Sequence, residues 1–196
     1  MSRGRDKFKK FSPIIKLLVR LTGFLPLCTL KQFLVFFQQT KGTKGLVIRY
    51  ILLKCICLEC GDNVSVHPNV YLFYPERLSL GSNVSIHPMC YIDAVGNISI
   101  GNDVSIAHGA TILSSSHNYQ RLDVPIKDQG LTTKKTIIED NVWIGEKATV
   151  LYGITVETGS IIGANSVVTK NINSNAIVAG VPAAVVNTRV MEKSKE

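Results

Sequence analysis

The feature that most constrains the fold is a six-residue periodicity between residues 138 and 170. An apolar residue returns there at every sixth position: Ile138, Ile144, Val150, Val156, Ile162 and Val168. This period matches neither the three-to-four-residue spacing of an α-helix nor the alternation of a simple strand. It indicates a β-solenoid, in which each short strand is followed by a corner and successive coils stack on one another.

The same pattern extends toward the N-terminus as a repeat of 20 residues. Segments 58–77, 78–97 and 98–117 align without a gap, and their sixfold positions are Cys60, Val66, Leu72, Leu80, Ile86, Ile92, Ile100, Ile106 and Ile112. We expect these side chains to point inward. A second inward set lies two residues earlier and includes Val84, Cys90, Val104, Ala110, Ala148, Ser160 and Ser166. Glycines are expected to supply tight corners at Gly61, Gly81, Gly101, Gly145 and Gly163.

Charge divides the chain near residue 57. Residues 1–57 contain 12 Lys/Arg and one acid, whereas the remainder contains 10 Lys/Arg and 13 acids. Hydrophobic residues make up 45% and charged residues 18%, which is ordinary for a globular protein. We expect a basic, apolar helical segment over residues 1–57, a β-solenoid domain over residues 58–187, and a polar tail over residues 188–196.

The N-terminal segment has two interpretations. Its apolar spacing predicts helices over residues 14–27 and 46–58, separated by a short apolar piece at 33–37 and a linker at 41–45. Internal charges, Gly23 and Pro26 argue against a membrane span. The helices could cap the open end of the solenoid. Alternatively, residues 1–40 could make peripheral contact with anionic lipid.

Cysteine usage and charge distribution exclude several classes. Five cysteines and no recognisable cleavable signal peptide predict a cytoplasmic protein without a disulfide framework. Cys55, Cys57 and Cys60 lack a second cluster that would complete a zinc site, so we expect no metal. The basic segment carries no helix-turn-helix or aromatic pattern, so we expect no nucleic-acid partner.

An insertion interrupts the solenoid over residues 114–136. The inward pattern breaks after Leu113 and resumes at Ile138. Long insertions in solenoids are commonly binding loops, so we expect the chemistry here. The insertion contains His117, Tyr119, Arg121, Asp123, Lys127, Asp128, Lys134 and Lys135.

Three motifs carry a family resemblance over residues 58–187. They are NVWIG at 141–145, IIGANSVVTK at 161–170 and AIVAGVPAAVV at 176–186, preceded by SSSHN at 114–118. Together they resemble hexapeptide-repeat acyltransferases of the galactoside, maltose and xenobiotic acetyltransferase type. The resemblance implies a left-handed parallel β-helix and a homotrimer that binds acetyl-CoA in clefts between subunits.

The resemblance also implies roles for particular residues. His117 matches the catalytic base and Trp143 an aromatic wall of the site. The coenzyme A tunnel matches Gly145, Ala164, Thr169 and Lys170, and the amide of Glu146 matches the donor to the thioester carbonyl. Two basic positions that commonly meet coenzyme A phosphates are Ala184 and Asn187 here, so Arg189 or Lys170 would have to serve. The usual acceptor-binding position falls near Met89, which leaves the acceptor open.

These roles predict an acetyl-CoA-dependent O-acetyltransferase with direct ternary-complex transfer. A histidine suits the base, because an alcohol is a poor nucleophile until its proton is removed. His117 ends its coil at the position that Asn97 takes in the coil before, so Asn97 should lie directly beneath His117, about 4.8 Å away at the usual strand spacing. Asn97 or Asp93 would then orient the ring or hold the acceptor. The basic N-terminus favours a saccharide acceptor in a bacterial surface polysaccharide or its precursor, at the inner face of the cytoplasmic membrane.

Other functions remain open from the sequence. Gamma-class carbonic anhydrases share the β-helix and bind zinc through three histidines, for which His87, His108 and His117 are candidates. The acetyl acceptor could be a small non-sugar molecule. A purely structural solenoid is a third alternative. His67 and His87 occupy equivalent places in adjacent coils, which predicts a stacked surface pair.

Overall fold

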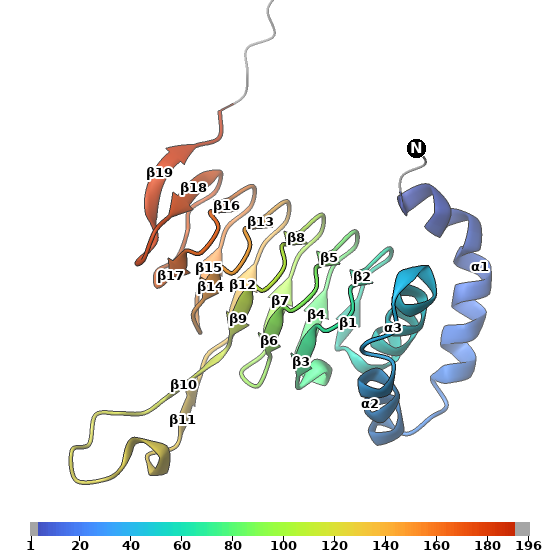
Figure 1. Cartoon of the computed structure of the whole chain (residues 1–196), viewed down its shortest axis with the longest axis horizontal. Helices are drawn as coiled ribbons and strands as arrows, with labels where there is room; N and C mark the ends of the chain where they lie inside the picture. Colours follow the sequence, from blue (N-terminus) through green and yellow to red (C-terminus); the bar gives the residue numbers. More distant parts are fainter. Residues whose placement is uncertain (1–3, 191–196) are drawn as a thin grey trace, which may run out of the picture.

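The structure is a computed structural model that describes residues 4–190, with side chains for residue 8 and from residue 11 onward. Three helices precede a parallel β-solenoid (Figure 1): α1 (Gly4–Thr22), α2 (Leu27–Phe36) and α3 (Gly42–Ile56). The basic side chains at residues 3, 5, 7, 9 and 10 lie outside the described part. Residues 191–196 of the predicted polar tail also lie outside it.

Each coil passes through three parallel sheets in turn. Sheet A contains β1 (Glu59–Cys60), β4 (Leu78–Leu80), β7 (Ile98–Ile100), β12 (Thr136–Ile138) and β15 (Thr155–Val156). Sheet B contains β2 (Ser65–Val66), β5 (Ser85–Ile86), β8 (Ser105–Ile106), β13 (Trp143–Ile144), β16 (Ile161–Ile162), β18 (Ala176–Ala179) and the antiparallel β19 (Ala184–Thr188). Sheet C contains β3 (Tyr71–Phe73), β6 (Tyr91–Asp93), β9 (Thr111–Leu113), β14 (Thr149–Val150) and β17 (Val167–Val168).

The two predicted inward sets fill the core. Ile106, Ile112 and Ile144 have no exposed surface. Cys60 and Leu72 are only partly buried, because they lie in the first coil, which has a neighbouring coil on one side only. Complete burial of an aliphatic side chain contributes about 1.5–3 kcal/mol. The repeated inward positions are therefore a principal source of stability.

The predicted glycines are required for close stacking, and the left-handed turn falls elsewhere. A Cβ on Gly61 would lie 2.4 Å from the carbonyl carbon of Gly81, and one on Gly81 would lie 2.5 Å from that of Gly101. Positive φ angles occur instead two residues later, at 58° for Asn63 and 60° for Asn83. Asparagine tolerates this conformation better than most residues. The prediction that glycine itself supplies the turn is wrong at these corners.

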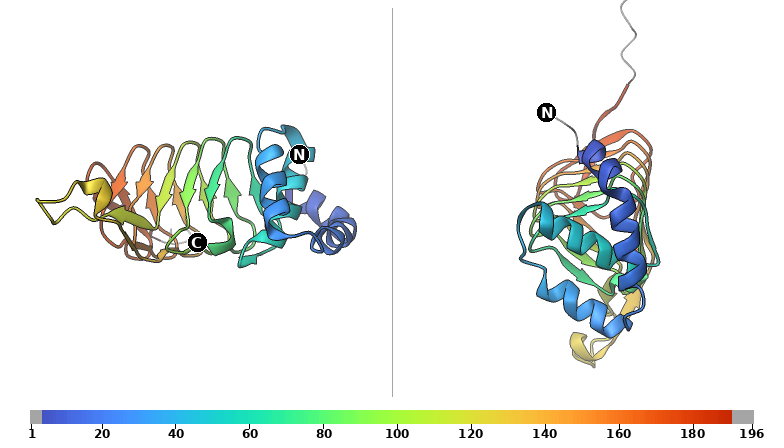
Figure 2. Two further views of the ribbon diagram at one scale, coloured as in Figure 1. Left: turned by 90° about the horizontal axis from the view of Figure 1, so that it is seen from below. Right: turned by 90° about the vertical axis from the view of Figure 1, so that its right-hand side faces the viewer.

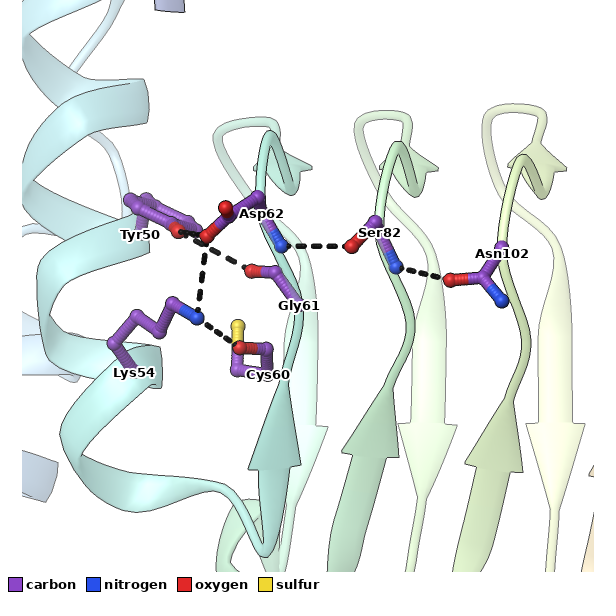
Figure 3. A network of polar contacts seen from close by, with 7 residues as sticks. All are labelled: Tyr50, Lys54, Cys60, Gly61, Asp62, Ser82 and Asn102. Atoms are coloured by element: carbon purple, nitrogen blue, oxygen red, sulfur yellow. Dashed lines mark hydrogen bonds and ion pairs between the residues drawn. The ribbon is translucent and has the colours of Figure 1, made fainter. Parts of the chain in front are cut away.

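The helices cover the N-terminal end of the solenoid (Figure 2). α3 packs on the first coil, and its Leu53 is completely buried. The Tyr50 hydroxyl donates to the carbonyl of Gly61 over 3.2 Å, and Lys54 lies 3.5 Å from the carboxylate of Asp62 (Figure 3). These contacts support the capping interpretation for α3. None of the described helices is long and apolar enough to cross a bilayer.

The helix boundaries differ from those predicted. α1 begins at Gly4 and contains Pro13, and α2 extends the apolar piece at 33–37 back to Leu27. The linker expected over residues 41–45 is mostly the first turn of α3. Gly45 permits this start, because a Cβ there would collide with the carbonyl oxygen of Thr40 at 2.0 Å.

Arg49 joins α2, α3 and the first coil. Its side chain is 2% exposed, and its Nε donates to the carbonyl of Val66 over 2.7 Å. Its Nη1 donates to the carbonyls of Phe37 and Thr40, beyond the end of α2, over 3.0 and 2.9 Å. Burial lowers the guanidinium pKa below its usual value, but arginine remains protonated in proteins. One buried cation thus fixes the helical cap to the solenoid.

Arg49→Met should lower the free energy of unfolding by at least about 3 kcal/mol, because hydrogen bonds from a charged donor contribute about 1.5–3 kcal/mol each and their buried acceptors would be left unpaired. Urea unfolding followed by circular dichroism measures this change. Lys16→Met is the control, since Lys16 is exposed and has no hydrogen-bond partner among residues 4–190. A loss of less than about 1 kcal/mol for Arg49→Met would contradict this role.

Candidate active site

The insertion that carries His117 forms a projecting hairpin (Figure 1). β10 (Ser115–His117) pairs antiparallel with β11 (Leu131–Thr133), and His117 lies opposite Leu131. Ile126–Asp128 form a 3-10 turn near the tip. The side chain of His117 is exposed. The hairpin therefore presents an accessible imidazole on an ordered strand, where the sequence predicted a loop.

Asparagine and threonine side chains order the hairpin on both sides of His117. Asn118 donates to the carbonyl of Gln129 over 3.1 Å and accepts from the hydroxyl of Thr132 over 2.5 Å. Near the tip, Arg121 Nε donates to Asp123 over 3.0 Å, and this hydrogen bond holds the pKa of the Asp123 carboxyl below its usual value. The strand that bears His117 is thus held by side-chain bonds in addition to its backbone ladder.

Asp93 anchors the base of the hairpin. Its Oδ2 accepts a hydrogen bond of 2.7 Å from the hydroxyl of Ser115, two residues before His117. Its main-chain carbonyl accepts a 2.6 Å bond from the buried Ser114. The carboxylate of Asp93 therefore acts on the position of β10, and no contact joins it to the imidazole of His117.

Asn97 does not lie beneath His117 as predicted. The coil position above it is occupied by the chain that returns from the insertion, since the amide of Thr136 donates to the carbonyl of Asn97 over 3.2 Å. Thr136 is also paired with Ile98 in sheet A. The repeat ends at Ser114, because the chain then turns outward into β10. A strictly repeating register cannot anticipate this departure.

A second group of predicted residues lies at the corner between sheets B and C. Trp143 begins β13 and is 53% exposed. Gly145 and Glu146 follow β13. Ala164 follows β16 and occupies the position of Glu146 one coil later. A Cβ on Gly145 would lie 2.6 Å from the amide nitrogen of Ala164. Gly145 is thus required for stacking, whatever else it contacts.

The amides at this corner differ from those at the corner between sheets A and B. There, the amide of Asp62 donates to Ser82 Oγ over 3.0 Å, and the amide of Ser82 donates to Asn102 Oδ1 over 2.8 Å (Figure 3). Among residues 4–190, the amides of Glu146 and Ala164 have no such acceptor. Two backbone donors therefore remain available to a ligand.

The side chain of Glu146 is already engaged. Its Oε2 lies 3.0 Å from Nε2 of His108, a pairing that the sequence analysis missed. The only signal in the sequence was that His108 is displaced by one residue from the positions of His67 and His87. These two rings stack as predicted, with centroids 5.0 Å apart. Because the carboxylate is engaged, the backbone amide is the group that Glu146 offers.

Thr169 and Lys170 lie at the C-terminal ends of the sheet C strands, whereas Glu146 and Ala164 lie at their N-terminal ends. Thr169 and Lys170 follow β17, two strands along sheet C from β9, where the hairpin leaves, and both are exposed. Arg189, the alternative to Lys170, donates through Nη1 to the carbonyl of Gly159 over 2.7 Å. Gly159 follows β15, at the corner between sheets A and B. Lys170 is therefore the better placed of the two cations.

Within one chain the predicted site residues form two separate groups. The strands of sheet C separate the two groups. Glu146 lies at the corner before these strands, and His117, Thr169 and Lys170 lie beyond their C-terminal ends. The two described cavities are located elsewhere: one of 570 Å³ lies among α1, α3 and the first coil, and one of 320 Å³ lies beside sheet A. Neither cavity is lined by a residue of either group.

The three candidate zinc ligands, His87, His108 and His117, do not lie together within one chain. His87 and His108 follow strands of sheet B, whereas His117 is on the hairpin that leaves sheet C. Over the described residues, no group of three or more His, Cys, Asp and Glu side chains could hold a metal ion. The three histidines thus do not form a site within one chain.

Comparison with known proteins identifies the repeats. The family model described as bacterial transferase hexapeptide (six repeats) matches residues 135–170. Galactoside O-acetyltransferase of Escherichia coli K12 is 32% identical over 139 residues, which cover 70% of this chain and 67% of the relative. An acetyltransferase provisionally assigned to colanic acid biosynthesis in the same organism, WcaF, is 28% identical over 72% of this chain and 75% of its own length.

Solved structures agree with the sequence matches. A maltose O-acetyltransferase from Clostridium difficile 630 superposes with a TM-score of 0.74 at 25% identity, over 83% of this chain and 86% of that chain. A galactoside acetyltransferase in complex with coenzyme A gives a TM-score of 0.73 at 27% identity, over 82% and 79%. The predicted left-handed parallel β-helix with an N-terminal helical segment is confirmed.

Asp93→Ala should loosen the base of the hairpin, because it removes the acceptor of the Ser115 hydroxyl. We expect faster amide hydrogen exchange across residues 115–117 and 131–133, with little change in the solenoid strands. Asp123→Ala removes a carboxylate at the hairpin tip and is the matched control. Ser115→Ala should reproduce the part that comes from this bond, since the Asp93 carboxylate also accepts from the amide of Val95 over 3.2 Å, and the double variant should add nothing to Asp93→Ala. Full additivity would contradict a shared contact.

Proposed function

Since the chain belongs to the hexapeptide-repeat acetyltransferases, which use acetyl-CoA as the acetyl donor, we propose that it acetylates a hydroxyl group of a sugar. Two observations carry this proposal: an exposed histidine lies on an anchored hairpin, and two backbone amides at a separate corner of the coils have no hydrogen-bond acceptor among residues 4–190. Galactoside and maltose O-acetyltransferases are among the similar proteins, which favours a saccharide acceptor.

His117 is the general base in this proposal. Its imidazole accepts the proton of the acceptor hydroxyl as that oxygen attacks the acetyl carbon, which makes the oxygen a competent nucleophile. Asp93 is a positioning residue, because it holds Ser115 on the same strand. Asn97 lies four residues after Asp93 and remains a candidate for acceptor binding at the foot of the hairpin.

The residues around the second group fit coenzyme A. The amides of Glu146 and Ala164 are free to donate, and an amide is suited to an oxyanion that develops at a thioester carbonyl. Trp143 offers an exposed aromatic surface near this corner, and Thr169 and Lys170, which lie with the first group after the sheet C strands, offer a hydroxyl and a cation for phosphate. Acetyl-CoA supplies the acetyl group as an activated thioester, so transfer needs no further cofactor from the protein.

His117→Ala should lower the rate of acetyl transfer by about 10²–10⁴-fold, which is the usual contribution of a general base. The side chain is exposed, so the variant should fold normally. His87→Ala removes a histidine from the stacked pair and should retain activity. The assay follows acetyl-CoA-dependent thiol release with a panel of mono- and oligosaccharides, with mass spectrometry of the product. Undiminished transfer by His117→Ala would assign the base elsewhere.

We place the complete site between subunits of a homotrimer. Sheet C separates His117 from Glu146 and Ala164 within one chain, and a neighbouring subunit can bring the missing half to each group. Cyclic symmetry would then repeat one composite site at each interface. This arrangement makes each subunit the source of a base for one site and of the donor-binding corner for another.

Co-expression of two inactive variants tests the composite site. His117→Ala lacks the base, and Ala164→Trp blocks the donor corner at an exposed position. In mixed trimers about one site in four combines an intact base with an intact corner from the neighbouring chain, so activity should partly return. Separately purified variants that are mixed without subunit exchange are the control. No recovery in mixed trimers of confirmed composition would indicate that both groups act within one chain.

The N-terminal segment supports a location at the inner face of the cytoplasmic membrane. Residues 1–40 combine apolar surface with a large excess of basic residues, which favours peripheral contact with anionic lipid. Such contact would bring the enzyme to a lipid-linked precursor of a surface polysaccharide. The similarity to an acetyltransferase provisionally assigned to colanic acid biosynthesis supports this class of acceptor.

A further inference from the structure

α1 exposes an apolar face that nothing in the described chain covers. Ile15 and Val19 face the core, whereas the neighbouring arc of the helix is open to solvent. The exposed arc follows the three-to-four-residue spacing of one helix face: Phe11 at 51%, Ile14 at 59%, Leu17 at 58%, Leu18 at 40%, Leu21 at 59% and Phe24, just beyond the helix, at 82%. A monomeric soluble protein rarely leaves such a contiguous stripe exposed.

The cavity among α1, α3 and the first coil opens beside this face. It has a volume of about 570 Å³. Phe11, Ile14 and Leu18 belong both to the cavity lining and to the exposed arc. Its mouth is therefore continuous with the apolar surface of α1. The volume is within the range of small-molecule sites, which is about 300–1,000 Å³.

The cavity offers few polar groups to a ligand. Asn63 already donates to Asn83 over 3.0 Å, and the hydroxyl of Ser65 faces the carbonyl of Val84 at 3.5 Å. Lys44 and Thr43, in the first turn of α3, are exposed and have no hydrogen-bond or ion-pair partner among residues 4–190. By contrast, the nearby cations Lys31 and Lys54 are paired with acids. A ligand here needs an apolar body and one anionic end.

We propose that this cavity binds one hydrocarbon chain of an anionic membrane phospholipid, with the phosphate beside Lys44. This inference rests on the membrane location proposed above. A sugar or nucleotide is a poor fit, because the walls would leave its polar groups unpaired. A second copy of the same segment is disfavoured, because residues 1–57 carry 12 basic residues and one acid, and two such surfaces repel each other. An anionic lipid matches both the charge and the apolar walls.

A bound chain would have a consequence for the helices. It would pack against α1 and α3 together, so lipid binding would stabilise the arrangement that presents the exposed arc to the bilayer. The cavity and the exposed arc would then bind lipid together, because Phe11, Ile14 and Leu18 belong to both.

Titration calorimetry with lysophosphatidylglycerol carrying a 16-carbon chain, below its micelle concentration, tests the site on the full-length protein. We expect one saturable site for each chain and at least tenfold weaker binding of the zwitterionic lysophosphatidylcholine. Lys44→Glu should weaken binding of the anionic lipid at least tenfold, whereas Lys41→Glu, three residues earlier and outside the cavity lining, should change it less than threefold. Equal effects of the two variants would overturn the phosphate contact.

A second pair of variants tests the chain site itself. Leu46→Trp introduces a large side chain into the cavity lining and should abolish saturable binding, whereas Val35→Trp on the exposed surface of α2 should not. Unfolding curves establish that both variants fold. Retention of saturable lipid binding by a folded Leu46→Trp would overturn the proposal. A change in the oligomeric mass of Leu46→Trp in light scattering, with lipid binding intact, would also overturn it, because a second copy of the chain would then occupy the apolar face. Acetyl transfer to a soluble sugar, measured in parallel, reports on the proposed enzyme activity independently of lipid binding.

Discussion

The stacking of parallel coils at the distance of one backbone hydrogen bond is the constraint on which the structure depends. It leaves no room for a Cβ where the carbonyl carbon of the next coil would lie 2.4 or 2.5 Å away, as at Gly61 and Gly81. It also requires inward side chains that fit a narrow core in every coil, such as Ile106 and Ile144. Because each coil contacts only its neighbours, the end of the stack needs a separate cap. Arg49 and the rest of α3 satisfy that need by binding backbone carbonyls.

The same stacking explains how a repetitive scaffold acquires a reaction site. At one corner each exposed amide is satisfied by a side chain of the next coil, as Ser82 satisfies Asp62. At the corner of Glu146 and Ala164 the equivalent acceptor is missing from the described chain, so two backbone donors are left without a partner there. The rigidity of the coils holds these donors in place without charged residues. In the proposed mechanism the fold therefore contributes backbone dipoles, and an insertion adds the acid-base group.

The sequence predicted the repeated part of the molecule well because every coil restates the same steric rule. The inward positions and the stacked His67–His87 pair follow from that repetition. It failed where the chain leaves the repeat. The register placed His117 over Asn97, but the hairpin bonds of Asp93 with Ser114 and Ser115 turn the chain outward first. The pairing of His108 with Glu146 joins residues 38 positions apart through side chains alone, and no local period records such a contact.

Charge separation along the chain relates the cap to the reaction site. The segment before residue 58 is strongly basic, whereas the solenoid carries more acids than bases. An anionic surface attracts the first and repels the second, so in the proposed membrane location the helical end would face the bilayer and the coils would extend away from it. The hairpin leaves sheet C two strands after the first coil, a rise of about 10 Å at the usual strand spacing. Because the helices of the cap lie between the first coil and the bilayer in this arrangement, a base at that height would meet sugars that extend beyond the lipid headgroup.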